Sequence, residues 1–571
     1  MLLSNLGVLA TAPGGVARLR ELILTLAVQG KLVPQDPSDE PASKLLTKIR
    51  TEKDRLIAEG KIKRGKPIAG IAEERPFELP RGWCWTHVAD ICSMVTDGEH
   101  VTPQRCADTT AIPLVTAKNV RHEVMDYTVT DFVPFDVAEK CWQRCKPAVG
   151  DVLMVSVGAT LGRLCVLRDA VDMVLVRSVS VLRPMQLGVI PDFLARHLMS
   201  PGTQREIWGE VKQSAQPCLY LAKSAALKIA LPPLAEQSRI VTRVEELMRL
   251  CDALEAKGRL EAAQHAQLVS TLLGTLLDSP TPTILAENWQ RIATHFDLLL
   301  DRPQAVDALE QTILQLAVRG LLVPQDPTGE PAAHLLQKIR QEKDCLIAEG
   351  KIKRDKPLLP IAEEEQPFEL PLGWEWVRMG DVFDGGSGTT PLRARADYFA
   401  GGTEMWVKTT DLTNGLVTTC EELVTKAAVA ENRLKHFPVG TVCVAMYGGA
   451  GTIGKSGVLG VSSTINQSVF ALPPTDGIDV GFLHTYVITV RSQWMSFAAG
   501  LRKDPNINGQ IIKKMVMPLP PLAEQSRIVT RVASLRRLCA DLRQRLAASQ
   551  STQAHLAEAL VSSVGSGLPV S

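Results

Sequence analysis

The sequence predicts an α/β (α+β) protein built as a tandem pseudo-twofold repeat, in which two α/β domains with mixed or antiparallel sheets are separated by two long antiparallel coiled-coil helices. Three observations support this prediction. Long segments occur twice, at a separation of about 290 residues. Each copy carries an apolar stripe with coiled-coil spacing. Between the repeated segments lie short β-rich runs separated by Gly, Pro, Asp and Asn.

The repeat organises the chain of 571 residues. Three pairs of segments recur: "LAVQGKLVPQDPSDEPASKLLTKIRTEKDRLIAEGKIKRGKP" (26–67) as "LAVRGLLVPQDPTGEPAAHLLQKIRQEKDCLIAEGKIKRDKP" (316–357), "RPFELPRGWCW" (75–85) as "QPFELPLGWEW" (366–376), and "LPPLAEQSRIVTRV" (231–244) unchanged at 519–532. This period is too long for a solenoid, so we infer duplication of a whole domain. The stretches at 84–230 and 375–518 share little identity, so the repeated segments form a common frame around two different inserts.

The frame segments read as helices. One helix is expected to start at Asp39-Glu40-Pro41, where carboxylates and proline suit a first turn, and to stop at Gly60. A longer helix follows each "PPLAEQ". Its apolar residues alternate in steps of four and three, at Ile240, Val244, Leu247, Cys251 and Leu254 and again at Ile528, Val532, Leu535, Cys539, Leu542 and Leu546. The stripe could pack on the helix's own domain, but two equivalent copies favour pairing of the two helices with each other.

The inserts are predicted to be α/β domains. Runs such as "DVLMVSVG" and "DMVLVRSVSVLRP" in the first, and "GTVCVAMYG" and "INQSVFALPP" in the second, read as short strands. Helical segments such as "PDFLARHLMSPGTQREIWGEV" follow near the C-terminal end of each insert. We therefore expect a mostly antiparallel or mixed sheet in each insert.

Composition narrows the class of protein. Hydrophobic residues make up 45% and charged residues 22%, as in ordinary globular proteins. Twelve cysteines occur without a C-x-x-C pair, and no apolar run is long enough for a membrane span, so we expect a cytoplasmic protein with reduced thiols and no membrane partner. The net charge is +1. Because Lys and Arg supply much of the affinity for nucleic acid, DNA binding would require local clustering of cations or a partner.

One motif suggests a nucleotide hydrolase. Gly449, Gly454, Lys455 and Ser456 match the phosphate-loop spacing G-x-x-x-x-G-K-S. A working loop of this kind opens a helix, whereas "SGVLGVSSTINQSVF" reads as a second strand. We therefore interpret the motif as a glycine hairpin that presents a cation. We find no H-E-x-x-H and no G-x-S-x-G motif, and we expect no catalytic residues and no metal site.

The repeated segments carry a family resemblance. "QGKLVPQDPSDEPASKLL", "PFELPRGWCW" and the duplicated "PLPPLAEQSRIV" resemble the specificity subunit (S, or HsdS) of type I restriction-modification systems. "TDGEHVTPQ" and "IPLVTAKNV" in the first insert, and "SGTTP", "ADYFAGGTEMWVKTTDL" and "TINQSVFAL" in the second, resemble the target-recognition domains of that family. The likeness extends in order over nearly the whole chain, twice.

The resemblance implies a non-catalytic subunit that binds double-stranded DNA. Each target-recognition domain would read one half of an asymmetric bipartite site, and the helices would set the spacing. Two modification subunits would carry S-adenosylmethionine and methylate adenine at N6. Restriction subunits, which use ATP and Mg, would join through them, while this chain would bind no cofactor itself. The domains expected on this basis are an N-terminal helical region (1–76), target-recognition domain 1 (77–234), a central long helix (235–278), a linker with the second helical region (279–367), target-recognition domain 2 (368–522) and a C-terminal long helix (523–571).

Candidate DNA-binding residues are polar or cationic side chains on the expected loops, because base edges are read by forked donors and acceptors. In the first insert they are His100, Thr102, Lys118, Asn119, Arg121, Thr160 and Arg163. In the second they are Thr389, Lys408, Thr409, Asp411, Lys455, Arg502, Lys503, Asn506 and Asn508, with a local turn or cap as the alternative for Asp411. We expect the helix interface at Ile240, Val244, Leu247, Leu254, Ile528, Val532, Leu535, Leu542 and Leu546.

Two tryptophan pairs need a separate interpretation. Trp83 with Trp85, and Trp374 with Trp376, could stack on bases, but their place in the repeated frame favours packing within the domain. Two other functional classes stay open from the sequence: a coiled-coil adaptor with protein-binding inserts, and a phosphate-loop NTPase. A self-sufficient methyltransferase would need a cofactor loop that we do not find.

Overall fold

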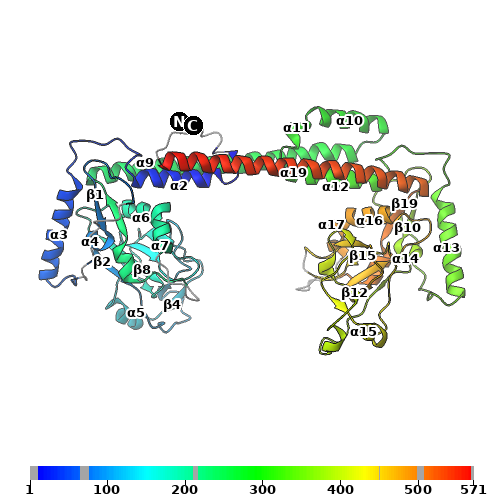
Figure 1. Ribbon diagram of the computed structural model, residues 1–571, viewed down its shortest axis with the longest axis horizontal. Helices are drawn as coiled ribbons and strands as arrows, with labels where there is room; N and C mark the ends of the chain where they lie inside the picture. The colour runs from blue at the N-terminus through cyan, green and yellow to red at the C-terminus, as the bar shows by residue number, and fades with distance from the viewer. Residues whose placement is uncertain are drawn as a thin grey trace. The chain divides into compact units, whose positions relative to one another are not determined.

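The computed structural model describes residues 9, 11–64, 68, 76–209, 217–448, 451–497 and 507–566. These residues divide into two compact units (Figure 1), of which unit 1 holds residues up to Glu261 and from Gln550 onward, and unit 2 holds Ala262–Ser549. The chain passes from unit 1 to unit 2 along helix α9 (Leu234–Leu277) and returns along α19 (Leu522–Ser566). The two helices therefore run in opposite directions through the units, as the repeat predicts.

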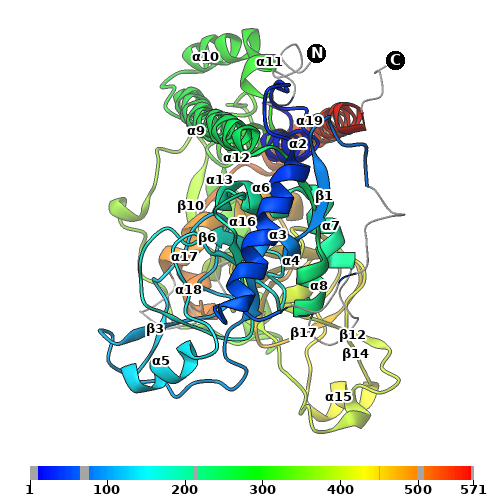
Figure 2. The same cartoon turned by 90° about the vertical axis from the view of Figure 1, so that its left-hand side faces the viewer.

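Unit 1 contains two frame helices, an insert, and a closing pair of strands. Its elements before α9 are α2 (Gly15–Val28), α3 (Ala42–Ala58), β1 (Cys84–His87), α4 (Val88–Ile91), β2 (Cys92–Asp97), β3 (Ile112–Val115), β4 (Asp131–Val133), α5 (Phe135–Trp142), β5 (Val152–Val155), β6 (Leu164–Val166), β7 (Val174–Leu175), β8 (Val179–Pro184), α6 (Pro191–Met199), α7 (Pro201–Gly209), α8 (Leu221–Ala226) and β9 (Lys228–Leu231). Figure 2 shows α3 lying along the flank of this insert.

Unit 2 repeats this order after a short helical linker. Its elements before α19 are α10 (Pro282–Thr294), α11 (Phe296–Leu299), α12 (Pro303–Val318), α13 (Ala332–Ala348), η1 (Glu363–Glu365), β10 (Glu375–Arg378), α14 (Met379–Val382), β11 (Gly386–Ser387), η2 (Ala396–Tyr398), β12 (Glu404–Val407), η3 (Thr409–Asp411), β13 (Gly415–Val417), β14 (Leu423–Val424), α15 (Lys426–Glu431), β15 (Val442–Ala445), β16 (Ser456–Leu459), β17 (Thr464–Ile465), β18 (Val469–Leu472), α16 (Val480–Thr489), α17 (Arg491–Phe497), α18 (Gly509–Lys514) and β19 (Val516–Leu519).

The two inserts have related sheet topologies despite their different sequences, and the main sheet of unit 2 has a fifth strand, β13, which pairs parallel with β16. The main sheet has strand order β2-β8-β5-β6 in unit 1 and β11-β18-β15-β16-β13 in unit 2. A smaller mixed sheet, β4-β3-β7 or β14-β12-β17, joins one antiparallel and one parallel pair. The predicted mixed or antiparallel α/β fold is thus confirmed. The core of each insert consists of buried valines, leucines and isoleucines on the strands of its main sheet, such as Val152 in the first insert and Val442 in the second.

Each insert enters and leaves the frame through one two-stranded ribbon. β1 pairs antiparallel with β9, so that Cys84 lies opposite Leu231, and β10 pairs with β19, so that Glu375 lies opposite Leu519. The ribbon brings the two ends of an insert of about 145 residues to neighbouring positions. An insert can therefore differ in sequence without moving its points of attachment.

The apolar stripe of each long helix has more than one partner. In unit 1, buried Ile240 and Val244 share a core with α2 and with Ala557 of α19, and Leu247 and Leu254 pack against it. In unit 2, Leu535, Leu542 and Leu546 pack against a core that α12 and the end of α9 form together, whereas Ile528 and Val532 pack with Trp374 and Phe482. Both interpretations of the stripe therefore hold in part, because α2 and α12 add a third helix to the seam.

A buried carboxylate fixes the start of each long helix to the frame. Glu236, 1% exposed, accepts hydrogen bonds from Trp83 Nε1 (3.0 Å) and Gln35 Nε2 (2.6 Å). Glu524, 2% exposed, accepts from Trp374 Nε1 (3.1 Å) and Gln325 Nε2 (2.8 Å). The frame tryptophans thus pack inside the domain, as their place in the repeat predicts.

The next residue of the motif ties the same helix to the insert. The Gln237 amide, fully buried, accepts from Ile190 N (2.9 Å) and donates to the carbonyl oxygen of Gly188 (3.0 Å). Gln525 does the same with Asp479 N (2.7 Å) and the Gly477 carbonyl (3.1 Å). The repeated "AEQ" therefore supplies two buried polar side chains at the start of each long helix. We call these pairs, Glu236 with Gln237 and Glu524 with Gln525, the clamp: the glutamate bonds to the frame and the glutamine bonds to the insert.

The clamp also explains the repeated glycine of "LAVQG" and "LAVRG". Gly30 has φ +66, and a Cβ atom there would lie 2.4 Å from Pro80 Cγ and 2.9 Å from Trp83 Cζ2. At Gly320 the corresponding distances to Pro371 and Trp374 are 2.5 and 2.9 Å. Only glycine lets the end of α2 or α12 approach the indole that reaches the buried carboxylate.

We predict that Trp83→Phe lowers the free energy of unfolding by about 1–3 kcal/mol more than Trp85→Phe, because only Trp83 donates to a buried carboxylate. Trp85 is the matched control, since its Nε1 is buried without a hydrogen-bond partner. Urea unfolding of the full chain, followed by circular dichroism, measures both variants. Equal losses in the two variants would show that the hydrogen bond does not stabilise the clamp.

The difference in unfolding free energy between Trp83→Phe and Trp85→Phe should depend on pH. Burial raises the pKa of Glu236, although the hydrogen bonds from Trp83 and Gln35 oppose this. A carboxyl group with a raised pKa contributes fully to stability below its ordinary pKa and loses that contribution as pH rises through the raised value. Without the Trp83 donor the pKa rises further, so the gap between the variants should widen from about pH 4 to about pH 7.

Candidate nucleic-acid interface

The first insert brings three ionisable side chains together at the end of β2. His100 Nε2 lies 3.0 Å from Asp97 Oδ2 and 2.9 Å from Arg144 Nη2, and Arg144 also bonds the Asp97 carboxylate. His100 is exposed, so its ring can reach a ligand while Asp97 and Arg144 orient it. Thr102 lies two residues further along the same loop, also exposed. Arg144 was missed in the sequence, although "WQRCKP" carries two cations in six residues.

The loop after β3 carries two exposed cations, Lys118 and Arg121, and one buried amide side chain, Asn119. Lys118 Nζ pairs with Asp131 at 3.2 Å and Arg121 Nε with Asp126 at 3.2 Å, and both are exposed. Asn119 between them is fully buried. Its Oδ1 accepts from Thr116 N (2.9 Å), and its Nδ2 donates to the carbonyl oxygens of Asp126 (3.0 Å) and Val129 (3.2 Å). The prediction of a base contact at Asn119 is therefore wrong, because the side chain instead holds the loop that presents Lys118 and Arg121.

The phosphate-loop match is a β-hairpin. Gly454, Lys455 and Ser456 lead into strand β16, which pairs antiparallel with β15, so no helix follows the loop. Ser456 is buried in that strand, with Oγ 3.1 Å from His484 Nε2. Gly449 lies outside the described residues. The expectation of a glycine hairpin that presents a cation is confirmed, and the P-loop NTPase alternative loses its structural basis.

The first insert has the corresponding hairpin between β5 and β6. Val155 N donates to the Arg163 carbonyl at 2.8 Å, just as Ala445 N donates to the Lys455 carbonyl at 2.8 Å. Arg163 N closes the turn on the Thr160 carbonyl at 3.2 Å. The two inserts thus place Arg163 and Lys455 at equivalent positions, and both side chains are partly exposed.

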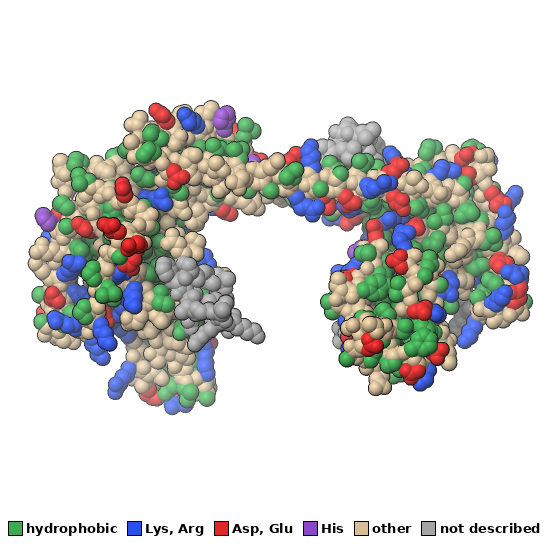
Figure 3. Space-filling model, turned by 180° about the vertical axis from the view of Figure 1, so that it is seen from behind, with side chains coloured by type: hydrophobic (Ala, Val, Ile, Leu, Met, Phe, Trp, Pro, Cys, Tyr) green, Lys and Arg blue, Asp and Glu red, His purple; other side chains and the backbone are tan. Residues whose placement is uncertain are grey.

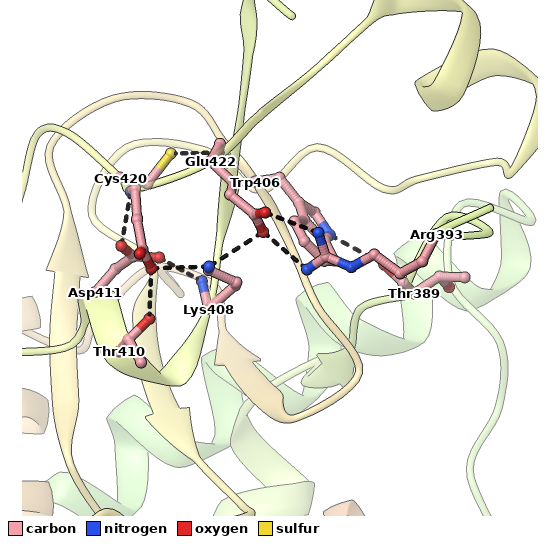
Figure 4. Close-up of polar contacts among 9 residues, drawn as sticks. Thr389, Arg393, Trp406, Lys408, Thr410, Asp411, Cys420 and Glu422 are labelled. Carbon is pink, nitrogen blue, oxygen red and sulfur yellow. Dashed lines mark hydrogen bonds and ion pairs between the residues drawn. The ribbon is translucent and has the colours of Figure 1, made fainter. Parts of the chain in front are cut away.

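The second insert contains a cluster in which two carboxylates hold two cations (Figure 4). Lys408 Nζ lies 2.9 Å from Glu421 and 3.1 Å from Glu422. The Arg393 guanidinium makes a bidentate pair with Glu422, at 2.7 and 2.8 Å. Asp411 caps the turn, because its carboxylate accepts from Lys408 N (2.7 Å) and Glu421 N (2.9 Å). Asp411 therefore has the predicted alternative role of a local cap.

These contacts keep the cluster charged at neutral pH. The hydrogen bond from Arg393 is the largest reason that the pKa of Glu422 lies at about 2. Partial burial opposes the charge on Lys408, but hydrogen bonds to Glu421 and Glu422 outweigh it and raise its pKa. In the described structure both cations are thus neutralised locally, and a base edge would have to compete with the carboxylates for them.

Arg393 is a candidate that the sequence did not reveal. Its guanidinium lies 4.8 Å from the Phe399 ring centre and 5.1 Å from that of Trp406, and its side chain is 54% exposed. Stacking and the bidentate pair fix the plane of a forked donor of the kind that reads guanine. The only sequence signal was the cation pair of "PLRAR", which stands between two segments already noted for the family resemblance.

The remaining candidate DNA-binding residues that the structure describes in the second insert make few side-chain contacts. Thr389 is exposed, and its carbonyl accepts from Trp406 Nε1 at 3.1 Å, while Thr409 begins the turn that Asp411 caps. Asn508 caps α18, with Oδ1 accepting from Ile511 N at 3.0 Å. The side chain of Asn508 thus has a structural partner. Arg502, Lys503 and Asn506 lie outside the described residues.

The surface charge is mixed. Lys and Arg side chains are interspersed with Asp and Glu on the face drawn in Figure 3, in agreement with the net charge of +1. Within the described ranges we find no group of three His, Cys, Asp or Glu placed to hold a metal ion. No described helix is both long and apolar enough to cross a membrane.

Comparisons with known proteins identify the family. A sequence model of the type I restriction modification DNA specificity domain matches residues 371–549. The type I restriction enzyme EcoAI specificity subunit of Escherichia coli is 35% identical, over 96% of this chain and 93% of that protein. The EcoEI specificity subunit of the same species is 34% identical over the same shares.

A solved structure concerning complex assembly and conformational transition of the type I R-M system contains a chain that is 17% identical to this one. The match covers 86% of this chain and 99% of that chain, with a TM-score of 0.49. Sequence identity over nearly the full length of the two Escherichia coli proteins decides the assignment. The chain belongs to the specificity subunits of type I restriction-modification systems, the non-catalytic components that recognise DNA.

Proposed function

We propose that each insert reads one half of an asymmetric bipartite DNA site. The observation that carries this proposal is that one frame, with one clamp, holds two inserts of related topology whose polar loop side chains differ. The first has exposed His100, Lys118 and Arg121, and the second has exposed Arg393 beside Lys408, which is 18% exposed. Because base pairs are distinguished by patterns of donors and acceptors, different side chains imply different half-sites.

The long helices would set the distance between the half-sites. α9 has 44 residues, which corresponds to a helix of about 66 Å. Half-sites read from one side of a duplex must lie near an integral number of turns apart, so a helical spacer restricts the gap that a bipartite site can have. Phosphate contacts would position each insert without contributing sequence information.

The long helices would also recruit two modification subunits. Leu250 (59%), Leu260 (58%), Leu538 (61%) and Leu556 (49%) are exposed on α9 and α19. These four leucines are apolar side chains that the long helices offer to a partner. A net charge of +1 further suggests that partners share the phosphate contacts, because affinity for DNA follows the number of phosphates neutralised.

The chemistry would then reside in the partners, in the cytoplasm. Modification subunits would bind S-adenosylmethionine and methylate adenine at N6, and restriction subunits would use ATP and Mg, as the family resemblance implies. This chain would bind none of these cofactors. The competing proposal is a coiled-coil adaptor with protein-binding inserts. It predicts that the complex has no specific affinity for DNA even when every partner is present.

A methylome tests the proposal. The chain is expressed with its modification subunit in an unmethylated host, and N6-methyladenine is mapped by single-molecule sequencing. We expect a split, asymmetric motif that disappears when the chain is omitted. Two soluble, associated proteins that leave no methylated motif would support the adaptor instead.

The same assay tests Arg393. We predict that Arg393→Lys, which keeps the charge but loses the fork, relaxes one position of one half-site, with a cost of about 1–3 kcal/mol in discrimination. Arg395→Lys is the matched control, because Arg395 is also exposed, pairs bidentately with Asp397 (2.6 and 2.8 Å) and lies 4.4 Å from the Tyr398 ring centre. An unchanged motif in both variants would remove Arg393 from the set of base-reading residues.

A further inference from the structure

Helix α13 changes character halfway along the face that it turns toward the insert. In its first half this face is apolar, and Leu335, Leu336 and Ile339 are buried in the core. In its second half the face continues with Arg340, Lys343, Asp344 and Ile347, at the spacing of one helical stripe. A stripe that only packed on the domain would stay apolar, so the charged half has a separate role to explain.

The charged half lines a groove between α13, the segment after it, and the base of the insert at α14 and α18. The groove has a volume of about 1080 Å³. Its five cationic side chains are Arg340, Lys343, Arg354, Lys356 and Lys513, against three carboxylates, Asp344, Asp355 and Asp381. Positive charge therefore exceeds negative charge in a protein whose overall balance is close to neutral.

Two of the five cations have structural partners and three are free. Lys343 Nζ donates to the Gly380 carbonyl at 2.6 Å and anchors the helix to α14, and Lys513 pairs with Asp355 at 2.6 Å. Among the described residues, Arg340, Arg354 and Lys356 make no ion pair, and all three are exposed. The groove thus offers fixed cations at its base and free cations at its rim.

Unit 1 repeats the residues that the frame contributes to this surface. Ile49 ends the apolar half of the α3 face, and Arg50, Lys53, Asp54 and Ile57 continue it, as in α13. Lys53 Nζ bonds the Ala89 carbonyl as Lys343 bonds that of Gly380. The basic segments "KIKR" at 61–64 and 351–354 are identical. Because the inserts differ and the frame side of this surface is repeated, we infer that its ligand is common to both halves of the complex.

We propose that this groove binds the phosphodiester backbone of duplex DNA outside the bases that the insert reads. The proposal rests on the proposed function and adds to it a contact that is independent of sequence. Both halves of a bipartite site share a backbone but not their bases. Lysine is depleted at the centres of protein interfaces, and only three of the lining residues are apolar, which favours a polyanion over a protein partner.

The position of α18 supports this assignment. Gln510 and Lys513 on α18 face the groove, and Asn508 caps the same helix. The segment immediately before α18 is the one whose side chains Arg502, Lys503 and Asn506 are proposed to reach DNA.

The test is the salt dependence of binding by the complex of this chain with its modification subunits. Fluorescence anisotropy is measured on one duplex that contains the methylated motif and on a scrambled duplex, both extending beyond the half-sites. For the double variant Arg354→Gln, Lys356→Gln we expect the slope of log K against log salt to fall by about 1.8, and the loss of affinity between about 50 and about 200 mM salt to be about twelvefold smaller than in the wild type. Both duplexes should respond equally, and the methylated motif should stay unchanged.

Lys338→Gln is the charge-matched control for the single variant Arg354→Gln. Lys338 lies on α13, but it pairs with Glu330 at 2.6 Å and does not line the groove. Arg354→Gln should lower the slope by about 0.9, and Lys338→Gln should leave it unchanged. Arg64→Gln should reproduce the effect in unit 1.

The outcomes separate this proposal from the proposed function. An unchanged slope in the double variant, or an equal change in Lys338→Gln, would overturn the groove as a DNA site even when the wild type methylates a split motif. Loss of the modification subunits from the purified variant would overturn it in favour of a protein contact. A wild-type complex without any methylated motif would instead contradict the proposed function itself.

Discussion

The structure depends on one constraint, which is that a buried carboxylate and a buried amide at the start of each long helix must find all their partners. Glu236 needs the donors of Trp83 and Gln35, and Gln237 needs the backbone of the turn before α6. A buried polar group without a hydrogen-bond partner costs free energy. The frame helix, the insert and the long helix are therefore held in the one arrangement that satisfies these groups. Each unit repeats this clamp with Glu524 and Gln525.

A fixed attachment gives the inserts freedom to differ. The ribbon of β1 and β9 closes the first insert, and that of β10 and β19 closes the second. The order of four main-sheet strands is shared, but the loops carry His100 with Arg144 in one insert and Lys408 with Arg393 in the other. We propose that the clamp orients these loops and that the loops determine the bases, whereas basic residues repeated in both units, such as Arg50 and Arg340, suit contacts that all DNA offers.

Much of this organisation could be predicted from the sequence, since repeats and apolar spacing are local signals. They gave the tandem frame, the long helices, the mixed sheets and the hairpin at Lys455. The sequence did not reveal contacts between distant residues. Asn119 reads as a polar loop residue, and only the folded loop shows that its amide is used up internally. The pair of Arg393 with Glu422 joins residues 29 positions apart, and the third helix of the seam depends on how α2 and α12 pack. The buried polar residues of "AEQ" could have been suspected, because this polar pair is repeated unchanged at the start of both long helices.

The central claim is that each insert reads its own half-site from a common frame. The most direct measurement is the methylome of a chain in which residues 84–230 are replaced by the corresponding insert of another specificity subunit, with the clamp residues kept. We predict a new motif in which one half changes, while the other half and the gap between them persist. A motif that changes in both halves, or in neither, would contradict it.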